Sequence, residues 1–161
     1  MFSVEAVRNI IRIALQPITA TRHPLYSANA EEILLMIACH ESSLGRHLRQ
    51  IGGGPGRGLF QVEPRTMRDN YINFINLKAG LALQIREVTG VTGPDNDQLT
   101  YNPLFGATMA RVWLYRRPGA LPSAHDLIAM AEYAKVNYNS AKGNANAEKY
   151  LIDYHRLVFE A

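Results

Sequence analysis

The chain has 161 residues, of which 47% are hydrophobic and 19% charged, and 17 Lys and Arg against 14 Asp and Glu leave a net charge of +3. This much apolar material excludes a disordered chain, and a single cysteine, Cys39, excludes a disulfide scaffold. The composition is that of one soluble globular domain. Its mild positive charge does not choose among cell-wall polymers, nucleic-acid phosphates and acidic membranes as partners.

The amino-terminal segment predicts where the chain is made. Its apolar residues are interrupted by Glu5, Arg8 and Arg12, whereas a secretory signal needs an unbroken apolar run of roughly 7–15 residues. No stretch approaches the roughly 20 apolar residues that span a bilayer. We therefore expect cytoplasmic synthesis without a signal peptide and no stable insertion into membranes.

The first half of the chain predicts two helices and a glycine-rich segment. Apolar spacing predicts a helix over about 4–16, ended by Pro17. Asn29 with Glu32 three residues later has the pattern of a capping box, which would open a helix running to about Ser42. Six glycines between 45 and 58 predict a loop or a small hairpin.

The second half predicts only helices. Pro64 marks the first turn of one, Asn102 would cap another, and Ser123 with Asp126 would cap a third. Further helices are expected over 77–88 and 148–159, and the Asp-Asn-Asp sequence at 95–97 is expected to form a turn. The fold class predicted is therefore mainly α, as a single domain over 1–161 with a small glycine-rich hairpin or loop lobe.

One carboxylate lies at the end of an apolar stripe. Glu41 follows the helical spacing of the apolar residues before it, at the point where the predicted helix reaches the glycine-rich segment. Desolvation there would raise the pKa of Glu41, and a carboxylic acid that stays protonated is suited to general-acid cleavage of a glycosidic bond. The alternative is a helix-end glutamate that reaches water or pairs with Arg46 or Arg49.

Four segments, in order, resemble the landmarks of the lysozyme-like lytic transglycosylase superfamily, especially its phage-encoded members. They are Ala-Cys-His-Glu-Ser at 38–42, Gly-Leu-Phe-Gln-Val at 58–62, Asn-Pro-Leu-Phe-Gly at 102–106, and Val-Asn-Tyr-Asn-Ser at 136–140 followed by Gly143. This resemblance implies a lysozyme-like fold and cleavage of the β-1,4 bond between N-acetylmuramic acid and N-acetylglucosamine in peptidoglycan. It also implies intramolecular attack that leaves 1,6-anhydromuramoyl ends.

The resemblance also implies roles for individual residues. Glu41 would be the catalytic acid and base, and Tyr138 would place its hydroxyl beside Glu41 to orient it. Gln61 would offer amide donors and an acceptor to the substrate, and Asn139 would fix the local backbone. Phe60 would belong partly to the core and partly to the cleft wall. Ser42, Phe60, Gln61, Tyr138 and Asn139 are therefore the predicted substrate-binding residues, and no metal or cofactor is expected.

The chain departs from the pattern of this superfamily in two places. Gly52 stands where soluble members often carry a serine, and the glycines at 52–56 suggest a lid over the cleft. No second carboxylate has an obvious partner position, and the candidates are Glu63, Asp69, Asp95, Asp97 and Asp126. A hydrolysing muramidase of the same fold, or a non-catalytic virion or cell-wall-binding protein, is therefore the alternative function. A nucleic-acid-binding helical domain ranks third.

The expected partners follow from this function. They are peptidoglycan glycan strands and other phage virion proteins, and nucleic acid is not an expected partner. The chain is expected to be a monomer that acts on the cell wall or periplasm as an endolysin or virion component. Five arginines surround the predicted cleft and could bind anionic polymers or simply face solvent: Arg46, Arg49, Arg57, Arg65 and Arg68. Buried Cys39 is expected to be an inert thiol.

Overall fold

The computed structural model describes residues 1–139 and 146–160, and this part of the chain is mainly α-helical, as predicted. It contains eight α-helices, one short 3₁₀ helix (η1) and no β-strand. The elements are α1 (Val4–Leu15), α2 (Ala28–Ser42), α3 (Pro64–Asn73), η1 (Ile75–Leu77), α4 (Ala79–Thr89), α5 (Asn96–Tyr101), α6 (Pro103–Tyr115), α7 (Leu127–Asn137) and α8 (Ala147–Val158).

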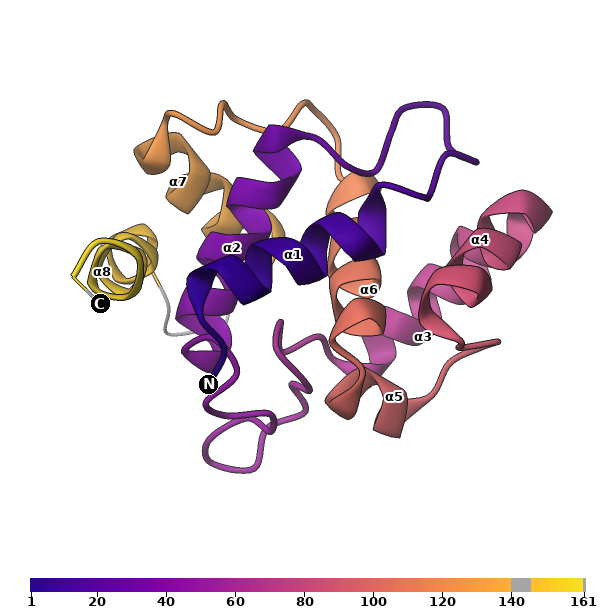
Figure 1. Cartoon of the computed structure of the whole chain (residues 1–161), viewed down its shortest axis with the longest axis horizontal. Helices are drawn as coiled ribbons and strands as arrows, with labels where there is room; N and C mark the ends of the chain where they lie inside the picture. The colour runs from indigo at the N-terminus through magenta and orange to yellow at the C-terminus, as the bar shows by residue number, and fades with distance from the viewer. Residues whose placement is uncertain (140–145, 161) are drawn as a thin grey trace.

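Two helices, α2 and α6, run through the middle of the molecule (Figure 1). Helix α1 crosses in front of them and contacts both. Helices α7 and α8 pack against α2 on one side, while α3, α4 and α5 pack against α6 on the other. The buried side chains of both sides join in one continuous core cluster.

Helix α2 is buried around its whole circumference. Every residue over 33–39 has no exposed surface, whereas α1 buries only a stripe that consists of Val7, Ile11, Ala14 and Leu15. A helix that is apolar on all sides is typical of the centre of a domain. The helix that ends in Glu41 is therefore the central helix, which holds that residue's backbone firmly in place.

Two local predictions are wrong. The capping box at Asn29 and Glu32 does not form, because Ser27 caps α2 by accepting a hydrogen bond from the Ala30 amide. The expected turn at 95–97 is instead the start of α5, since the Asp95 carboxylate accepts hydrogen bonds from the Asp97 and Gln98 amides. Both errors concern which of several neighbouring polar side chains acts as the cap.

Other helix ends agree with their predictions. Pro64 occupies the first turn of α3 and Asn102 caps α6. Of the predicted pair at the start of α7 only Asp126 caps the helix, because the Ser123 hydroxyl accepts from the His125 amide before the helix begins. Helix α4 begins two residues later than expected because η1 precedes it, and Gly90 ends it in the left-handed conformation. Proline and short polar caps act on their own immediate backbone, which is why they can be read from the sequence.

The glycine-rich segment forms turns held by isolated bridges, Arg49 with Arg57 and Arg57 with Val62. Gly58 shows why glycine is needed here: its φ is 73°, and a Cβ atom would lie 2.3 Å from the carbonyl oxygen of Leu99. Only a glycine therefore lets this segment approach α5 so closely. The predicted hairpin is reduced to these bridges, and the segment connects the end of α2 to the start of α3.

Within the described ranges, 1–139 and 146–160, no helix is long and apolar enough to cross a membrane.

Candidate acid site

A cleft of about 300 Å³ lies at the carboxyl end of α2. Its walls come from α2, the glycine-rich segment, the start of α3, and the carboxyl ends of α6 and α7. The lining residues are Glu41, Gln50, Gly56, Gln61, Val62, Glu63, Arg65, Thr66, Trp113, Arg117, Val136, Asn137, Tyr138 and Asn139. The predicted residues Glu41, Gln61, Tyr138 and Asn139 are thus brought together from three distant segments.

Glu41 is placed in this cleft by the last turn of α2. Burial raises the pKa of Glu41, and a hydrogen bond from Tyr150 and the proximity of His40 only partly oppose this rise. The hydroxyl of Tyr150 donates to Oε1 of Glu41 at 2.8 Å. The structure therefore shifts Glu41 toward its protonated form and places it in the lining of the cleft, as the apolar stripe of α2 predicted.

Tyr150 is the residue at this site that the sequence analysis missed. It lies on α8, is fully buried, and stacks on His40 with 4.0 Å between the ring centroids. Nδ1 of His40 is in turn 2.8 Å from Oδ2 of Asp153, and the side chain of Asn139 also hydrogen-bonds Tyr150. No local pattern distinguishes Tyr150 from the other aromatic residues of α8, so only the packing of α8 on α2 reveals its role.

Tyr138 does not hold Glu41 as predicted. Its hydroxyl donates to the backbone carbonyl of Phe60 at 2.6 Å, which fastens the end of α7 to the segment before α3. Burial and the nearby Glu41 raise the pKa of Tyr138, so its hydroxyl keeps its proton. The orienting hydrogen bond predicted for Tyr138 is therefore made by Tyr150 instead.

Ser42 and Phe60 lie behind the cleft rather than in its lining. The Ser42 hydroxyl donates to the Leu59 carbonyl at 2.6 Å and accepts from the Gly45 amide at 2.8 Å. The side chain of Phe60 is fully buried in the core. Both residues therefore join α2 to the segment that carries Gln61, and the described structure places neither against the cleft space.

Gln61 lines the cleft but is itself largely buried. Its backbone has a positive φ of 49°, and its Nε2 donates to the carbonyls of Gly58 at 2.8 Å and His47 at 3.1 Å. These two bonds fix the orientation of the amide and use its donors, so the predicted donation to a ligand is not available. Oε1 is buried without a hydrogen-bond partner among the described residues, and a Cβ at Gly56 would lie 2.8 Å from it. Gln61 therefore carries one acceptor that no described residue uses.

Of the five candidate second carboxylates, only Glu63 lines the cleft, and it is 2.5 Å from the guanidinium of Arg65. Asp69 pairs with Arg116, and Asp95 and Asp126 cap helices. Asp97 lies exposed in the first turn of α5. Glu41 is therefore the carboxyl group of the cleft that forms no ion pair among the described residues.

The basic cluster serves several purposes. Arg57 donates to the carbonyls of Gly54 and Gly56 and so holds the glycine-rich segment together, while Arg65 pairs with Glu63. Arg46, Arg49 and Arg68 are exposed. The cluster thus divides into structural and solvent-facing cations, in keeping with the two readings left open from the sequence.

No group of three or more potential metal ligands occurs in the described part of the chain. Burial raises the pKa of Cys39 to about 12, so this residue is a thiol rather than a thiolate. Ser140 and Gly143, which belong to the fourth sequence motif, lie outside the described residues, and Gly52 does not line the cleft.

Comparison with curated proteins places this chain near replication initiators. It is 25% identical over 159 aligned residues to the chromosomal replication initiator protein DnaA of Burkholderia cenocepacia, Burkholderia orbicola and Burkholderia multivorans. The alignments cover 92% of this chain but 28% of each relative, so the chain spans less than a third of the length of these proteins. No protein-family model and no solved structure matches the chain.

These matches correct the family predicted from the four motifs. The curated relatives are replication initiators and not lytic transglycosylases, so the predicted membership of the lysozyme-like superfamily is wrong, and with it the predicted cleavage of peptidoglycan and its muramidase and wall-binding alternatives. The physical reason is visible in the structure. Ser42 and Phe60, which contribute to the motifs, hold the core together, and helix ends joined by a glycine turn need such residues whatever the protein does.

Proposed function

We propose that the chain is an enzyme in which Glu41 acts as a general acid on a substrate bound in the cleft. The observation that carries this proposal is a carboxyl group whose pKa is raised by burial and that nevertheless borders the cleft. Protonated carboxylic acids of this kind assist the cleavage of bonds to oxygen leaving groups. The reaction class proposed is therefore acid-assisted cleavage of such a bond.

Tyr150 suits both protonation states of Glu41. As the bond breaks, its electron pair stays with the leaving oxygen, which takes the proton of Glu41. The resulting carboxylate keeps the hydrogen bond from the Tyr150 hydroxyl, and a hydrogen bond from a neutral donor favours the charged form of an acid. Glu41 can then accept a proton from the group that replaces the leaving oxygen, which returns the site to its starting state.

The unused acceptor of Gln61 indicates what the substrate should carry. A buried carbonyl oxygen without a partner is costly, and a ligand hydroxyl or N–H group would satisfy it. Because the Gln61 amide is fixed by two backbone carbonyls, this acceptor is preorganised. The proposed substrate is therefore a polar molecule with a hydrogen-bond donor beside the bond that breaks.

The test compares turnover by the wild type and by Glu41→Gln on methylumbelliferyl glycosides, phosphate esters and carboxylic esters. We expect turnover of at least one class by the wild type and a loss of roughly 100-fold or more in the variant. The rate should fall as pH rises through the raised pKa of Glu41, because the acid form is the active one. Glu63→Gln is the matched control, since it changes a carboxylate of the same cleft that is already paired with Arg65. Turnover that survives in Glu41→Gln, or none by the wild type, would overturn the proposal.

A second candidate function, association with DNA, is supported by the similarity to DnaA, which is named as a chromosomal replication initiator. This second candidate differs from the prediction made from the sequence, in which nucleic acid is not a partner. The exposed cations Arg46, Arg49 and Arg68 would be the groups that contact phosphates.

Fluorescence anisotropy with duplex DNA at several salt concentrations tests this candidate. We expect log K to fall linearly with log salt, and the slope to decrease by about 2–3 when all three arginines are replaced by Gln. Glu41→Gln should leave this binding unchanged, which separates the two candidates. Absence of binding at low salt would remove the DNA candidate.

The finer predictions on form and place also stay proposals. They are a lysozyme-like arrangement of the helices, a monomeric state and synthesis in the cytoplasm. An experimental structure, light scattering of the purified chain and cell fractionation would test them in turn.

A further inference from the structure

The wall of the cleft that α6 contributes contains a stacked cation. The guanidinium carbon of Arg117 lies 3.8 Å from the ring centroid of Trp113, and both residues line the cleft. The indole ring is itself held in place, because Nε1 of Trp113 donates to the backbone carbonyl of Asn137 at 3.2 Å. A guanidinium held against a fixed ring is restricted in the directions in which its N–H groups can donate.

Arg117 acts electrostatically on Asp69 and Tyr133 but is not paired directly with a carboxylate in the described part of the chain. Its Nε is buried without a hydrogen-bond partner, and no ion pair over 1–139 and 146–160 involves it. The carboxylate of Asp69 pairs with the neighbouring Arg116 instead, since Nη1 of Arg116 is 2.6 Å from Oδ2 of Asp69. The other oxygen of Asp69 accepts from Asn73 at 2.6 Å.

The acidic groups of the cleft do not neutralise Arg117 either. Glu63 is 2.5 Å from Arg65 and is thereby paired. The carboxyl group of Glu41 accepts a hydrogen bond from Tyr150, its pKa is raised by burial, and no ion pair of the described residues joins it to Arg117. A buried guanidinium N–H without an acceptor is unfavourable, and an anionic ligand would provide one.

We propose that Arg117, supported by Trp113, binds an anionic group, a carboxylate or a phosphate, of the molecule that occupies the cleft. This inference rests on the proposed function, because it names the class of substrate that Glu41 would act upon: a polar molecule that carries a negative charge. The planar guanidinium matches the two oxygens of either group with parallel hydrogen bonds. Gln61 and Arg117 would then bind a donor and an anion of the same ligand.

The test is a titration of the ¹⁵N-labelled chain with inorganic phosphate and, separately, with acetate, at constant ionic strength. The side-chain resonances of Arg117 Nε–H and Trp113 Nε1–H report directly on this wall. We expect both to shift in a saturable way. The titration that gives the lower Kd identifies the preferred anion.

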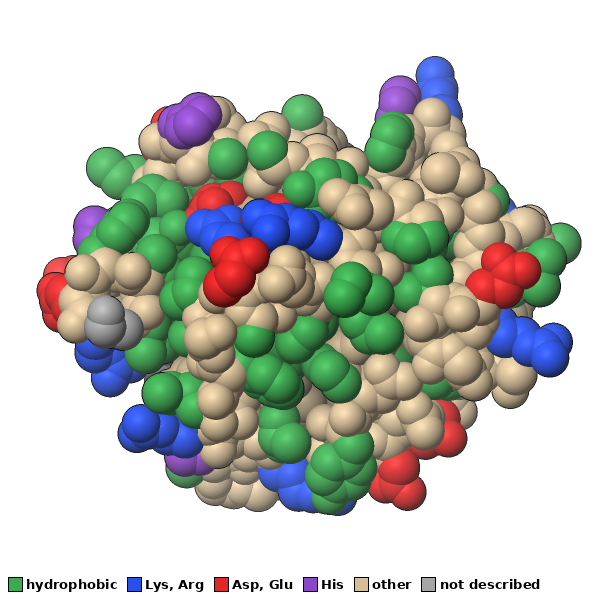
Figure 2. All heavy atoms as spheres, in the orientation of Figure 1, with side chains coloured by type: hydrophobic (Ala, Val, Ile, Leu, Met, Phe, Trp, Pro, Cys, Tyr) green, Lys and Arg blue, Asp and Glu red, His purple; other side chains and the backbone are tan. Residues whose placement is uncertain are grey.

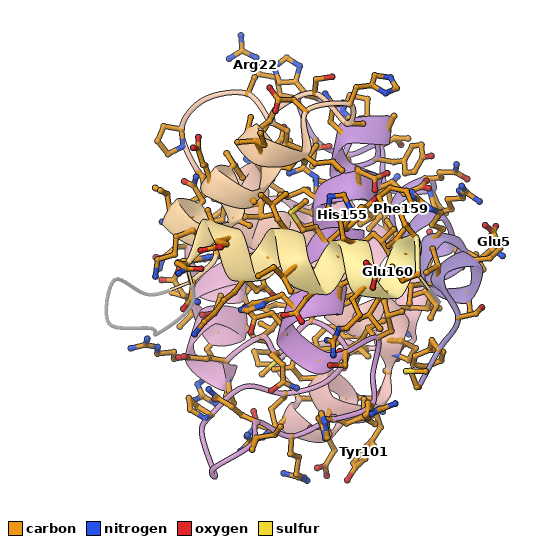
Figure 3. All side chains as sticks on the ribbon, turned by 90° about the vertical axis from the view of Figure 1, so that its left-hand side faces the viewer. Glu5, Arg22, Tyr101, His155, Phe159 and Glu160 are labelled. Carbon is orange, nitrogen blue, oxygen red and sulfur yellow. The ribbon has the colours of Figure 1, made fainter. Side chains whose placement is uncertain are left out.

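Two variants decide the interpretation. Arg117→Gln should raise the Kd at least about tenfold, whereas Arg22→Gln should change it less than about twofold. Arg22 is a matched control because it is an exposed arginine at the tip of the loop between α1 and α2, at the top of Figure 3, and does not line the cleft. If Arg117→Gln fails to fold by circular dichroism, Arg117→Lys, which keeps the charge but loses the planar fork, should still weaken binding severalfold.

Glu41→Gln separates this inference from the proposed function. It should bind the anion as tightly as the wild type at a pH below the raised pKa of Glu41, because residue 41 then carries no charge in either protein. Anion binding without turnover of any substrate would keep the site at Arg117 and discard the acid-catalysed reaction. Shifts that do not saturate, or that are equal at Arg22 and Arg117, would overturn the inference while leaving the role of Glu41 untouched.

Discussion

At the scale of single residues, the state of Glu41 depends on a neighbour that is distant in sequence. Tyr150 is 109 residues away along the chain and donates to Glu41 at 2.8 Å. Tyr138, which the motif singled out, donates to the Phe60 carbonyl instead. The two tyrosines thus have different functions: one holds the carboxyl group and the other holds the backbone of the cleft wall.

Replacing each tyrosine by phenylalanine distinguishes these functions. Tyr150→Phe should raise the pKa of Glu41 further, because the lost hydrogen bond is one of the interactions that lower it. Tyr138→Phe should leave the pKa of Glu41 nearly unchanged but lower the free energy of unfolding by roughly 1–3 kcal/mol, since the Phe60 carbonyl loses its partner. ¹³C NMR titration of the Glu41 carboxyl and urea denaturation measure the two effects. An equal pKa change in both variants would contradict this assignment.

At the scale of elements, the start of α2 shows how neighbouring polar residues share roles. Ser27 caps the helix, while Oδ1 of Asn29 accepts a hydrogen bond from the amide of Ala124 at 2.9 Å. Glu32, the other half of the predicted capping box, pairs with Arg8 at 3.0 Å and also bonds Tyr154 on α8. Tertiary partners therefore recruit the two residues that a local pattern assigned to the cap.

Alanine substitutions at the start of α2 test this division. Ser27→Ala should cost about 1 kcal/mol of stability and speed hydrogen exchange at the Ala30 amide, which loses its acceptor. Asn29→Ala should instead speed exchange at Ala124, in the segment before α7. Urea denaturation measures the loss of stability, and native-state hydrogen exchange measures the exchange rates of the two amides. Faster exchange at Ala30 in Asn29→Ala would restore the original capping prediction.

At the scale of the whole molecule, two buried glutamates respond to pH in opposite directions. Figure 2 shows acidic and basic side chains gathered over α1, where Glu31 is 3.0 Å from Arg8 and 2.8 Å from Arg12. Burial alone would raise the pKa of Glu31, but hydrogen bonds from Arg12, Tyr26 and Arg8 together lower it. Glu41 has a tyrosine partner, Tyr150, but no arginine partner among the described residues, and burial raises its pKa.

These shifts predict a maximum of stability near the ordinary glutamate pKa of 4.5 and a decline on either side. Because the pKa of Glu31 is lowered in the folded state, the stability that Glu31 contributes is lost as pH falls through this lowered, folded-state pKa. Because the pKa of Glu41 is raised in the folded state, the stability that protonated Glu41 contributes is lost as pH rises through this raised, folded-state pKa. Glu41→Gln should therefore exceed the wild type in stability at neutral pH, by on the order of 1 kcal/mol, and match it near pH 4.

Urea denaturation between pH 3 and pH 8 measures these profiles, within the range in which carboxylates titrate. Glu31→Gln is the matched comparison, because it should flatten the acidic side alone while lowering stability at neutral pH through its lost ion pairs. A Glu41→Gln profile that runs parallel to that of the wild type would show that Glu41 is not desolvated.

The sequence by itself determined the helical class and most helix ends, because prolines, caps and apolar spacing act within one or two turns. The same locality let Glu41 be found at the end of an apolar stripe. The sequence could not identify the partners of Glu41, the backbone carbonyls that occupy the donors of Gln61, or the lack of an ion-pair partner for Arg117. Nor could short motifs establish a family, since residues such as Ser42 and Phe60 serve packing as well.

Only the tertiary structure decided those features, because each depends on contacts between elements far apart in the chain. Helix α8 places Tyr150 on Glu41, carbonyls of the glycine-rich segment accept the hydrogen bonds of the Gln61 amide, and Asp69 pairs with Arg116. Hydrogen bonds and desolvation act over a few ångströms in space, whatever the separation in sequence. The candidate residues could therefore be identified from the sequence, but the fold determines their pKa shifts and which of their hydrogen-bonding groups remain unused.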